Sequence, residues 1–204
     1  RYGTLGYLKY KIGDVLDKYI QNNSINLNTD ISSNHNDRIY GPNWITTLSN
    51  SKVTLGTPSG SNILNYNNNL QNKIGQFLKN NNFKVISSLL NDSSDVELVY
   101  SMCNKEFDIP EELNLEVVSP KMFEAVENGT VLVMYESNYS NIFIKDVHYI
   151  SLKLDHSNIK EVIDKIKDNS FLQNMADTTY NDIVLSGKYN YQTFIQNTVD
   201  NVLQ

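Results

Sequence analysis

The segment that begins at Ser119 constrains the fold of this chain more than any other stretch of the sequence. Ser119 is a preferred helix N-cap residue, and Pro120 suits the first helical position because a proline lacks the N–H that would be unpaired there. Gly129 is the residue type that most often follows the end of a helix. We therefore expect a helix over residues 121–128 and, directly after it, a strand over the apolar and aromatic residues 131–135 that is buried on both faces.

Short apolar runs and amphipathic stretches alternate along most of the chain. Predicted helices cover residues 5–20, 44–48, 95–102, 121–128, 159–166, 171–185 and 194–202. Predicted strands cover residues 25–31, 53–55, 115–118, 131–135 and 148–152. Asn158 and Glu161 have the spacing of a capping box at the start of the helix that follows them. The alternation predicts an α/β fold with a mostly parallel sheet and helices on both faces, in a single domain over residues 1–204.

The composition is that of a globular chain without a broad basic face. Of its 204 residues, 40% are hydrophobic and 20% are charged, and the formal net charge is −6. This balance argues against binding to nucleic acid or anionic membranes, and no apolar run approaches the length of a transmembrane segment. Cys103 is the only cysteine, which excludes an internal disulfide framework and suits the reducing cytoplasm. The chain begins at Arg1 with neither a Met nor a leader, so we expect it to be a piece of a longer protein.

The predicted start of the 121–128 helix is the first candidate ligand site. Free N–H groups in the first turn of a helix bind anions, and ligands of open α/β sheets lie at the carboxyl ends of the strands. Ser119 and Lys121 would contact a diphosphate there, and the Glu124 carboxylate would accept hydrogen bonds from two neighbouring ribose hydroxyls. The alternative interpretation is that Glu124 is an ordinary solvated helix residue and Lys121 an ordinary surface lysine.

A loop of small residues follows the predicted strand 53–55 and is a second candidate site. Small side chains let backbone amides approach a phosphate or a sugar, so Thr57, Ser59 and Gly60 are candidate contacts. The loop lacks the Gly-Lys-Ser/Thr ending of a Walker loop, and a tight turn without a ligand explains it equally well. Arg38 is a further candidate, because guanidinium groups bind phosphate oxygens in pairs.

His148 opens the predicted strand 148–152 and is a candidate for sugar contact or proton transfer; a histidine satisfied by backbone groups is the alternative. The three histidines and the single cysteine show no metal-ligand spacing, so we expect no structural zinc. There is also no Asp-x-Asp triplet that could clamp a metal–diphosphate. We therefore expect no cofactor.

The run Ser-Pro-Lys-Met-Phe-Glu-Ala-Val-Glu-Asn-Gly-Thr-Val-Leu-Val, which starts at Ser119, resembles the Glu-Ala-x-x-x-Gly-Thr-hydrophobic motif of glycosyltransferases built from two Rossmann domains, the GT-B type. The likeness to a bacterial, group 1 type of glycosyltransferase-like subfamily extends over most of the chain. Its further matching segments are Asp30–Ser32, Asp37–Gly41, Trp44, Leu55–Ser61, Tyr139-Ser140, His148–Ile150 with Leu152, and Asp155–Asn158.

This resemblance implies a Rossmann-like C-terminal domain that binds a nucleotide-diphosphate sugar, with Glu124 holding the ribose of the donor. Glu116 completes a Glu-x7-Glu spacing with Glu124, and in retaining members the first carboxylate lies near the transferred sugar. A Gly-rich run usually follows that carboxylate; here Val117-Val118 follows, and a strand-flanking role for Glu116 is the alternative. The subfamily also has an acidic residue where this chain has Pro58, and an acidic-aromatic-acidic-Gly run at residues 65–68.

Together these features predict a metal-independent glycosyltransferase that transfers sugar from a nucleotide-diphosphate sugar to an acceptor hydroxyl, in glycan or polysaccharide synthesis. Its partner would be the acceptor-binding N-terminal half of the same protein. A catalytically degenerate module that binds a nucleotide or a protein partner in a glycan-assembly complex is the alternative, and a sugar epimerase of the same architecture is a third. The expected catalytic residues are Glu116 and His148, and the expected donor-binding residues are Arg38, Thr57, Ser59, Gly60, Ser119, Lys121 and Glu124.

Overall fold

The computed structural model describes residues 3–60, 69–83, 85–86, 89–90, 96–107 and 116–202. By its internal contacts the chain forms two compact units. Unit 1 comprises Arg1–Ile39 and Ser59–Glu116, and unit 2 comprises Tyr40–Pro58 and Val117–Gln204. The single domain expected over residues 1–204 stays a prediction.

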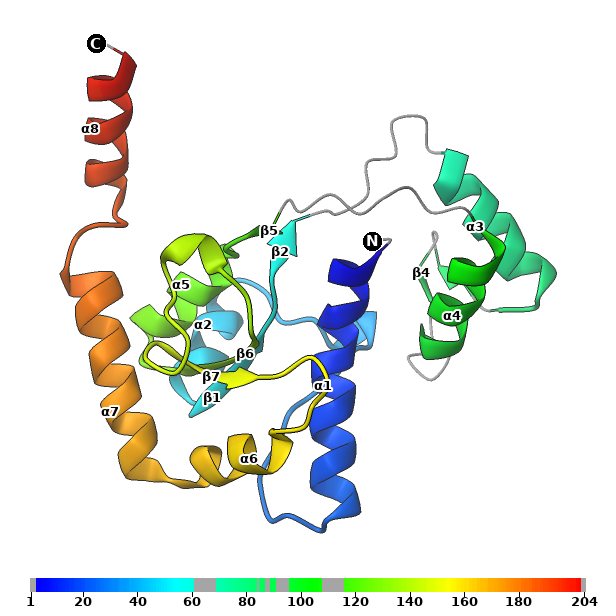
Figure 1. The fold of residues 1–204 in the computed structure, drawn as a ribbon, viewed down its shortest axis with the longest axis horizontal. Helices are drawn as coiled ribbons and strands as arrows, with labels where there is room; N and C mark the ends of the chain where they lie inside the picture. The colour runs from blue at the N-terminus through cyan, green and yellow to red at the C-terminus, as the bar shows by residue number, and fades with distance from the viewer. Residues whose placement is uncertain are drawn as a thin grey trace. The chain divides into compact units, whose positions relative to one another are not determined.

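A three-stranded parallel sheet forms the centre of unit 2 (Figure 1). Its strands, in spatial order, are β1 (Val53–Gly56), β6 (Val131–Tyr135) and β7 (Tyr149–Leu152). Val133 of β6 pairs in register with Leu55 on one side and with Ile150 on the other. The expected central position of the strand over residues 131–135 is thereby confirmed. Every residue of β6 is buried, as is usual for a strand without charged side chains between two neighbours.

Two helices, α2 (Pro42–Ser49) and α5 (Pro120–Glu127), pack on one face of this sheet. Leu132 and Met134 of β6 belong to the same apolar cluster as Met122 of α5 and Leu48 of α2. Both helices begin at a proline, as their sequences predict. Gly129 follows the end of α5 with a φ of 73°, which is the left-handed conformation that a residue after a helix end often adopts.

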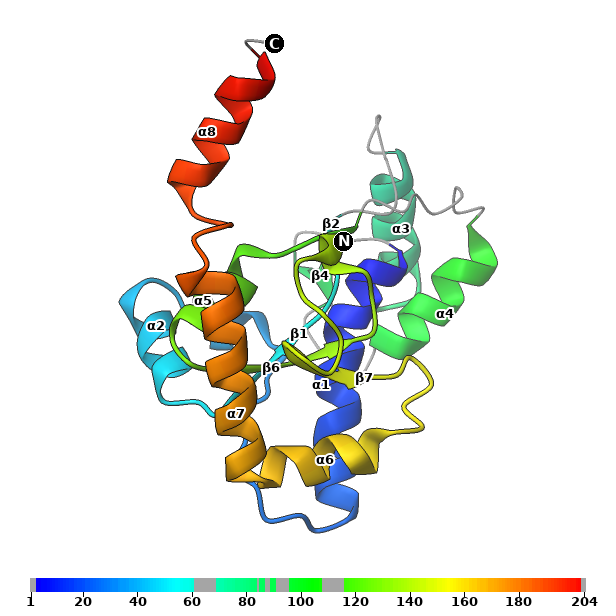
Figure 2. The same cartoon turned by 60° about the vertical axis from the view of Figure 1, so that its left-hand side comes forward.

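The remaining elements of unit 2 lie between and after the last two strands. They are the 3-10 turn η3 (Tyr139–Asn141), α6 (Ile159–Lys167), α7 (Asn169–Thr179), the π-helical segment η4 (Tyr180–Leu185) and α8 (Tyr191–Val202). α6 contacts β7, and its buried Val162 and Ile163 are not part of the cluster under α5. Figures 1 and 2 show α5 and α6 on opposite sides of the sheet. α8 leaves Tyr191, Phe194 and Ile195 exposed.

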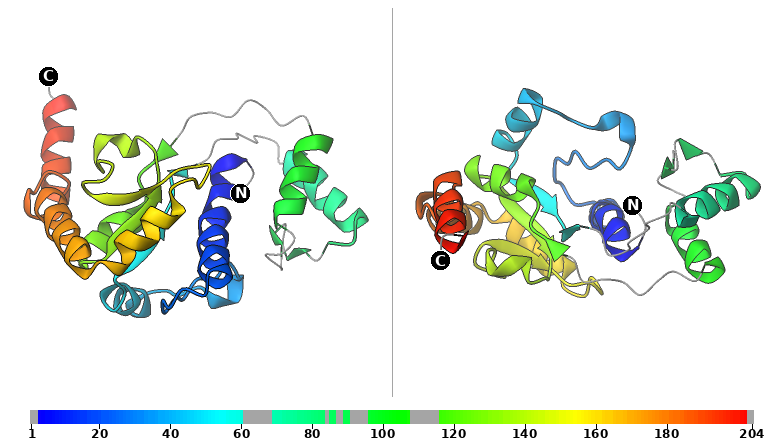
Figure 3. Two further views of the ribbon diagram at one scale, coloured as in Figure 1. Left: turned by 60° about the horizontal axis from the view of Figure 1, so that its bottom comes forward. Right: turned by 90° about the horizontal axis from the view of Figure 1, so that it is seen from above.

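Unit 1 is mostly helical. Its elements are α1 (Thr4–Asn22), η1 (His35–Asp37), β2 (Ser59–Gly60), α3 (Asn69–Asn80), β3 (Val85–Ile86), β4 (Leu89–Leu90) and α4 (Val96–Glu106). β2 pairs with β5 (Glu116–Val117), whose first residue is the last residue of unit 1. α3 and α4 lie side by side and share an apolar cluster that includes Leu78 and Val99 (Figure 3). α1 meets α4 through the stacked rings of Tyr7 and Tyr100, whose centroids are 4.1 Å apart.

The chain is therefore mixed α/β, with a small parallel sheet and helices on both of its sides, which agrees with the expected class. Among the described residues, no helix combines the length and the apolarity that a membrane crossing requires.

Residues 25–31, which were expected to form a strand, belong to no sheet. The backbone amide of Ile25 instead bonds to the carbonyl of Ile20 in α1, at 2.9 Å, and the amide of Leu27 bonds to the carbonyl of Ile25, at 3.0 Å. Because these backbone groups find partners close by in the chain, this short apolar alternation needs no neighbouring strand. The strand prediction is wrong for this reason.

The capping box expected at α6 is also wrong. Asn158 occupies the N-cap position, but its side chain does not cap the helix. Its Oδ1 accepts the Lys153 amide at 3.0 Å, and its Nδ2 donates to the Ser151 carbonyl at 2.8 Å. Glu161 pairs with Lys165 on the next turn of the helix, at 2.8 Å. The Asn158 side chain therefore closes the turn after β7 and does not start the helix.

Candidate functional site

The carboxyl ends of the three parallel strands face the same side of the sheet, and two helix starts are turned toward this side. α2 precedes β1 and α5 precedes β6, each through a short turn that reverses the chain. α5 has eight residues and is about 12 Å long, while the five residues of β6 span about 16 Å. The first turns of α2 and α5 therefore lie level with the carboxyl end of the sheet, which is where α/β proteins bind ligands.

The first turn of α5 retains groups that can bind an anion. Ser119 is the N-cap in an extended conformation, but its side chain makes no capping hydrogen bond. Pro120 has no N–H, and the Met122 amide bonds to the Ser119 carbonyl at 2.9 Å. The Lys121 amide is thus one of the helix's unpaired first-turn donors, next to an unused serine hydroxyl.

Lys121 is partly buried. Burial lowers the pKa of Lys121 below its ordinary value, and the negative charge of Glu124 acts in the opposite direction. The two residues are three positions apart, so they lie on the same face of α5. A partly buried cation favours an anionic ligand, because the negative charge of the ligand offsets the lost hydration of the cation.

Glu124 accepts a hydrogen bond from the indole N–H of Trp44, with 2.7 Å between Nε1 and Oε2. Trp44 stands in the first turn of α2 and Glu124 in the second turn of α5, so the bond joins these two helices on one face of the sheet. It occupies one carboxylate oxygen and leaves Oε1 as an acceptor for a ligand. Glu124 is therefore not a freely solvated helix residue, which was the alternative interpretation of its position.

Thr57 lies at the same end of the sheet, directly after β1. It is buried, and its hydroxyl donates to the Pro58 carbonyl over 3.4 Å. Of the residues expected at the donor, unit 2 therefore brings Thr57, Ser119, Lys121 and Glu124 to the carboxyl end of one sheet.

The other four expected contacts at this end belong to unit 1. Ser59 and Gly60 form β2, and the Ser59 hydroxyl accepts a hydrogen bond from the Lys9 ammonium at 3.3 Å. Arg38 is an exposed residue that follows η1, and Glu116 is an exposed residue of β5. Their roles toward a donor stay predictions.

His148 lies at the opposite, amino end of the sheet, because it immediately precedes β7. Its side chain is buried and bonded on both nitrogens: Nδ1 accepts the Ile144 amide at 3.1 Å, and Nε2 lies 3.1 Å from Asp182 Oδ2. These contacts match the alternative interpretation of a histidine satisfied by its own surroundings. The structure does not bring His148 together with Thr57 or with Glu124.

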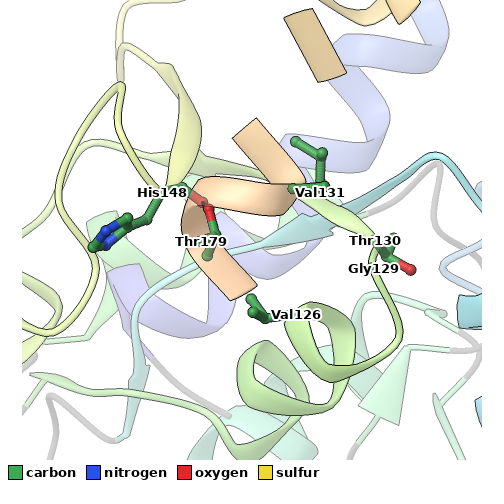
Figure 4. A pocket seen from close by; sticks show the side chains of 7 residues that line it. Val126, Gly129, Thr130, Val131, His148 and Thr179 are labelled. Carbon is green, nitrogen blue, oxygen red and sulfur yellow. Dashed lines mark hydrogen bonds between the residues drawn. The ribbon is translucent and has the colours of Figure 1, made fainter. Parts of the chain in front are cut away.

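A narrow depression without room for a water molecule lies at this amino end. Figure 4 shows His148, Thr179 and Val131 around it, together with the turn that carries Gly129. It is lined largely by methyl groups and backbone and is too narrow to enclose a ligand. It carries no functional assignment.

Two polar pairs at the carboxyl end were not foreseen as site residues. The Tyr135 hydroxyl lies 2.9 Å from His156 Nε2, and Lys145 pairs with Glu136 at 2.7 Å, an interaction that raises the pKa of Lys145. Tyr135 is the last residue of β6 and Glu136 follows it, so parallel pairing alone predicts both to lie at this end. Trp44 was also missed as a site residue, because its partner is distant in the sequence and no spacing rule connects them.

Within the described ranges, no group of three or more histidine, cysteine, aspartate or glutamate side chains could hold a metal ion. No protein-family model, curated protein or solved structure matches the chain significantly.

Proposed function

We propose that this chain is the Rossmann-like, donor-binding half of a GT-B type glycosyltransferase that uses a nucleotide-diphosphate sugar. The observation that carries the proposal is the position of Lys121 and Glu124: both lie on the helix whose start faces the carboxyl end of a parallel sheet, the position that the sequence motif implies for a donor site. The electrostatics support the proposal, because a partly buried ammonium suits a diphosphate and an indole-bound carboxylate suits a ribose.

Each residue has a defined role in this proposal. The first turn of α5 and the Lys121 ammonium bind the diphosphate, and Glu124 accepts hydrogen bonds from the ribose hydroxyls through its remaining lone pairs. The oxygen of an acceptor hydroxyl attacks the anomeric carbon, the bond from that carbon to the diphosphate oxygen breaks, and the acceptor proton is transferred to a base. The dipole of α5 and Lys121 stabilise the charge that develops on the departing diphosphate, with no metal required.

The acceptor and the enclosure of the reaction are assigned to the N-terminal half of the protein. In a two-domain architecture the reaction takes place in the cleft between the halves, and closure of this cleft excludes water and positions the acceptor. Glu116 is proposed to lie near the transferred sugar in that closed state. The chain alone should therefore bind a nucleotide weakly, in the range of roughly micromolar to millimolar Kd, and should not transfer sugar.

One sequence observation favours a second candidate, a non-catalytic module that binds a nucleotide. Pro58 stands where the resembled subfamily has an acidic residue, and a proline cannot act as an acid or a base. Donor binding through Glu124 does not depend on this position. A transfer assay on the full-length protein separates the candidates, because an enzyme releases nucleoside diphosphate in step with sugar transfer and a module binds without release.

The direct test is calorimetric titration of the chain with uridine, guanosine, thymidine and adenosine diphosphates. Glu124→Ala should weaken binding of the preferred nucleotide by about 1–3 kcal/mol, because a charged hydrogen-bonding group is lost. Glu127→Ala is the matched control: Glu127 lies on the same helix and is exposed, so its removal should leave the affinity unchanged. Equal affinities of a folded Glu124→Ala variant and the wild type would overturn the ribose role.

A further inference from the structure

We propose that Trp44 is a positioning residue of the donor site, whose indole N–H fixes the Glu124 carboxylate so that the site selects ribonucleotides over 2′-deoxyribonucleotides. This inference rests on the proposed function, since it concerns how the same site chooses its nucleotide.

The first observation is that only one of the two carboxylate oxygens of Glu124 accepts the hydrogen bond from Trp44. The bond from Trp44 Nε1 to Oε2, at 2.7 Å, is short and charge-assisted, and both side chains are partly buried. A carboxylate held at one oxygen cannot rotate freely about its last torsion angle. Its other oxygen therefore has a fixed direction, set by α2 and not by solvent.

The second observation is that α2 is itself tied to α5, so that Trp44 cannot simply follow a moving Glu124. The Ser49 hydroxyl donates to Asn128 Oδ1 at 2.8 Å, and Asn128 Nδ2 donates to the backbone carbonyl of Glu124 at 2.8 Å. The Thr130 hydroxyl donates to the Leu48 carbonyl at 2.7 Å, which anchors the end of α2 to the turn before β6. The indole donor and the carboxylate are thus held on two mutually fixed helices.

A fixed carboxylate discriminates between the two kinds of nucleotide more strongly than a mobile one. A ribose offers its 2′ and 3′ hydroxyls to the carboxylate together, whereas a deoxyribose leaves one acceptor direction without a donor. When the carboxylate cannot turn, that acceptor stays unpaired in a partly buried site, which is the condition under which sites reject analogues that lack a hydroxyl. A carboxylate freed from the indole can rotate toward water, and the preference then shrinks.

The test compares the affinities of nucleoside diphosphates and their 2′-deoxy forms by equilibrium dialysis for the wild type, Trp44→Phe, Glu124→Ala and the control Glu127→Ala. Trp44→Phe keeps an aromatic ring but removes the N–H donor, and should reduce the ribose-to-deoxyribose affinity ratio by about ten- to one-hundred-fold, the range for one charge-assisted hydrogen bond. Glu127→Ala removes an exposed carboxylate from α5 that takes no part in these bonds, and should leave the ratio unchanged. A merely structural effect of Trp44 would weaken both nucleotides equally.

Trp44 is also the only tryptophan of the chain, so its emission reports on the bond without any substitution. Its fluorescence should change on ribonucleotide binding in the wild type, and should not change in Glu124→Ala at saturating nucleotide. A wild-type ratio that is retained in Trp44→Phe but lost in Glu124→Ala overturns the role of Trp44 and leaves the proposed function standing. A wild-type chain that binds none of these nucleotides overturns the proposed function itself.

Discussion

His148 donates a hydrogen bond from Nε2 to Asp182 Oδ2 across 3.1 Å, which joins the residue before β7 to the π-helical segment η4. The direction of the bond follows from the other nitrogen of the ring. Nδ1 accepts the backbone N–H of Ile144, and because an amide N–H can only donate, Nδ1 carries no proton. The proton of the neutral ring is therefore on Nε2, and the histidine has no nitrogen left over for a substrate.

Replacing His148 with Leu should destabilise the fold by about 1–3 kcal/mol, because the Ile144 amide loses its acceptor and Asp182 loses its donor. Asp182→Ala should cost less, about 1 kcal/mol, because the Ile144 amide keeps its acceptor and only the Nε2–H of His148 loses a partner. Urea denaturation at pH 7 measures both changes. Equal losses for the two variants would contradict a structural role centred on the Ile144 contact.

Replacing Lys121 with Met should remove nucleotide binding and make the unliganded chain more stable, by up to about 1 kcal/mol at pH 7, because a partly buried charge is removed. The pH dependence provides a second signature. Since the folded pKa of Lys121 is lowered, the unfolded chain binds more protons between that pKa and the ordinary value of 10.5, and stability rises with pH in this window. Urea midpoints measured from pH 7 to pH 10.5 should show a shallower rise for Lys121→Met than for the wild type. Identical profiles would mean that the amine is solvated.

Tyr149 should contribute to alkaline unfolding. Its hydroxyl is buried without a hydrogen-bond partner of good geometry among the described residues, and burial raises its pKa to about 12, while the backbone of Ser137 acts in the opposite direction. Because the unfolded residue ionises near pH 10, the stabilisation is complete below pH 10 and is lost as the pH rises to 12, up to about 2–3 kcal/mol.

Tyr149→Phe should be close to neutral at pH 7 and should flatten this alkaline loss, as measured by circular dichroism at fixed urea concentrations between about pH 9 and about pH 12, the range in which tyrosine hydroxyls ionise. Tyr191→Phe is the matched control, since Tyr191 is 88% exposed. An unaltered alkaline profile in Tyr149→Phe would argue against the buried hydroxyl as its origin.

Replacing either of two glycines in open surroundings with alanine should change the stability of the fold, but in opposite directions. Gly129 has a φ of 73° and no neighbour within 4 Å of an added Cβ, so Gly129→Ala introduces backbone strain alone and should destabilise by about 1 kcal/mol. Gly75 lies inside α3, also without such a neighbour, and Gly75→Ala should stabilise by about 0.5–1 kcal/mol through helix propensity. Thermal melts should show a lower melting temperature for Gly129→Ala and a higher one for Gly75→Ala. A shift in the same direction for both variants would contradict these two explanations.

The sequence predicted the elements whose signals are local. Ser119, Pro120 and Gly129 mark the two ends of α5, and the run from residue 131 to residue 135 contains no charged residue, so the central buried strand could be recognised from composition. The alternation at residues 25–31 led to a wrong prediction, because a strand also needs a partner strand, and the amides of Ile25 and Leu27 bond to carbonyls close by in the chain.

Much of the candidate site depends on contacts that no local pattern encodes. Glu124 and Lys121 share a helix, so their common face follows from spacing. Trp44 reaches Glu124 from a helix that is distant in the sequence, and its indole donor gives no periodic signal. His148 was placed with the sugar by its type and by its strand position, but parallel pairing puts the residue before a strand at the amino end, away from Thr57.

The order of the strands in the sheet also has a consequence for the folding pathway. β6 and β7 are neighbours along the chain as well as in space, whereas β1 joins β6 only after the whole segment 59–116 has been bridged. Closing a long loop costs more conformational entropy than closing a short one, and contacts across long loops therefore form more slowly. The β6–β7 pair with α5 is therefore the natural nucleus, β1 docks last, and the amide protons of β1 should be the first in the sheet to exchange with solvent deuterium.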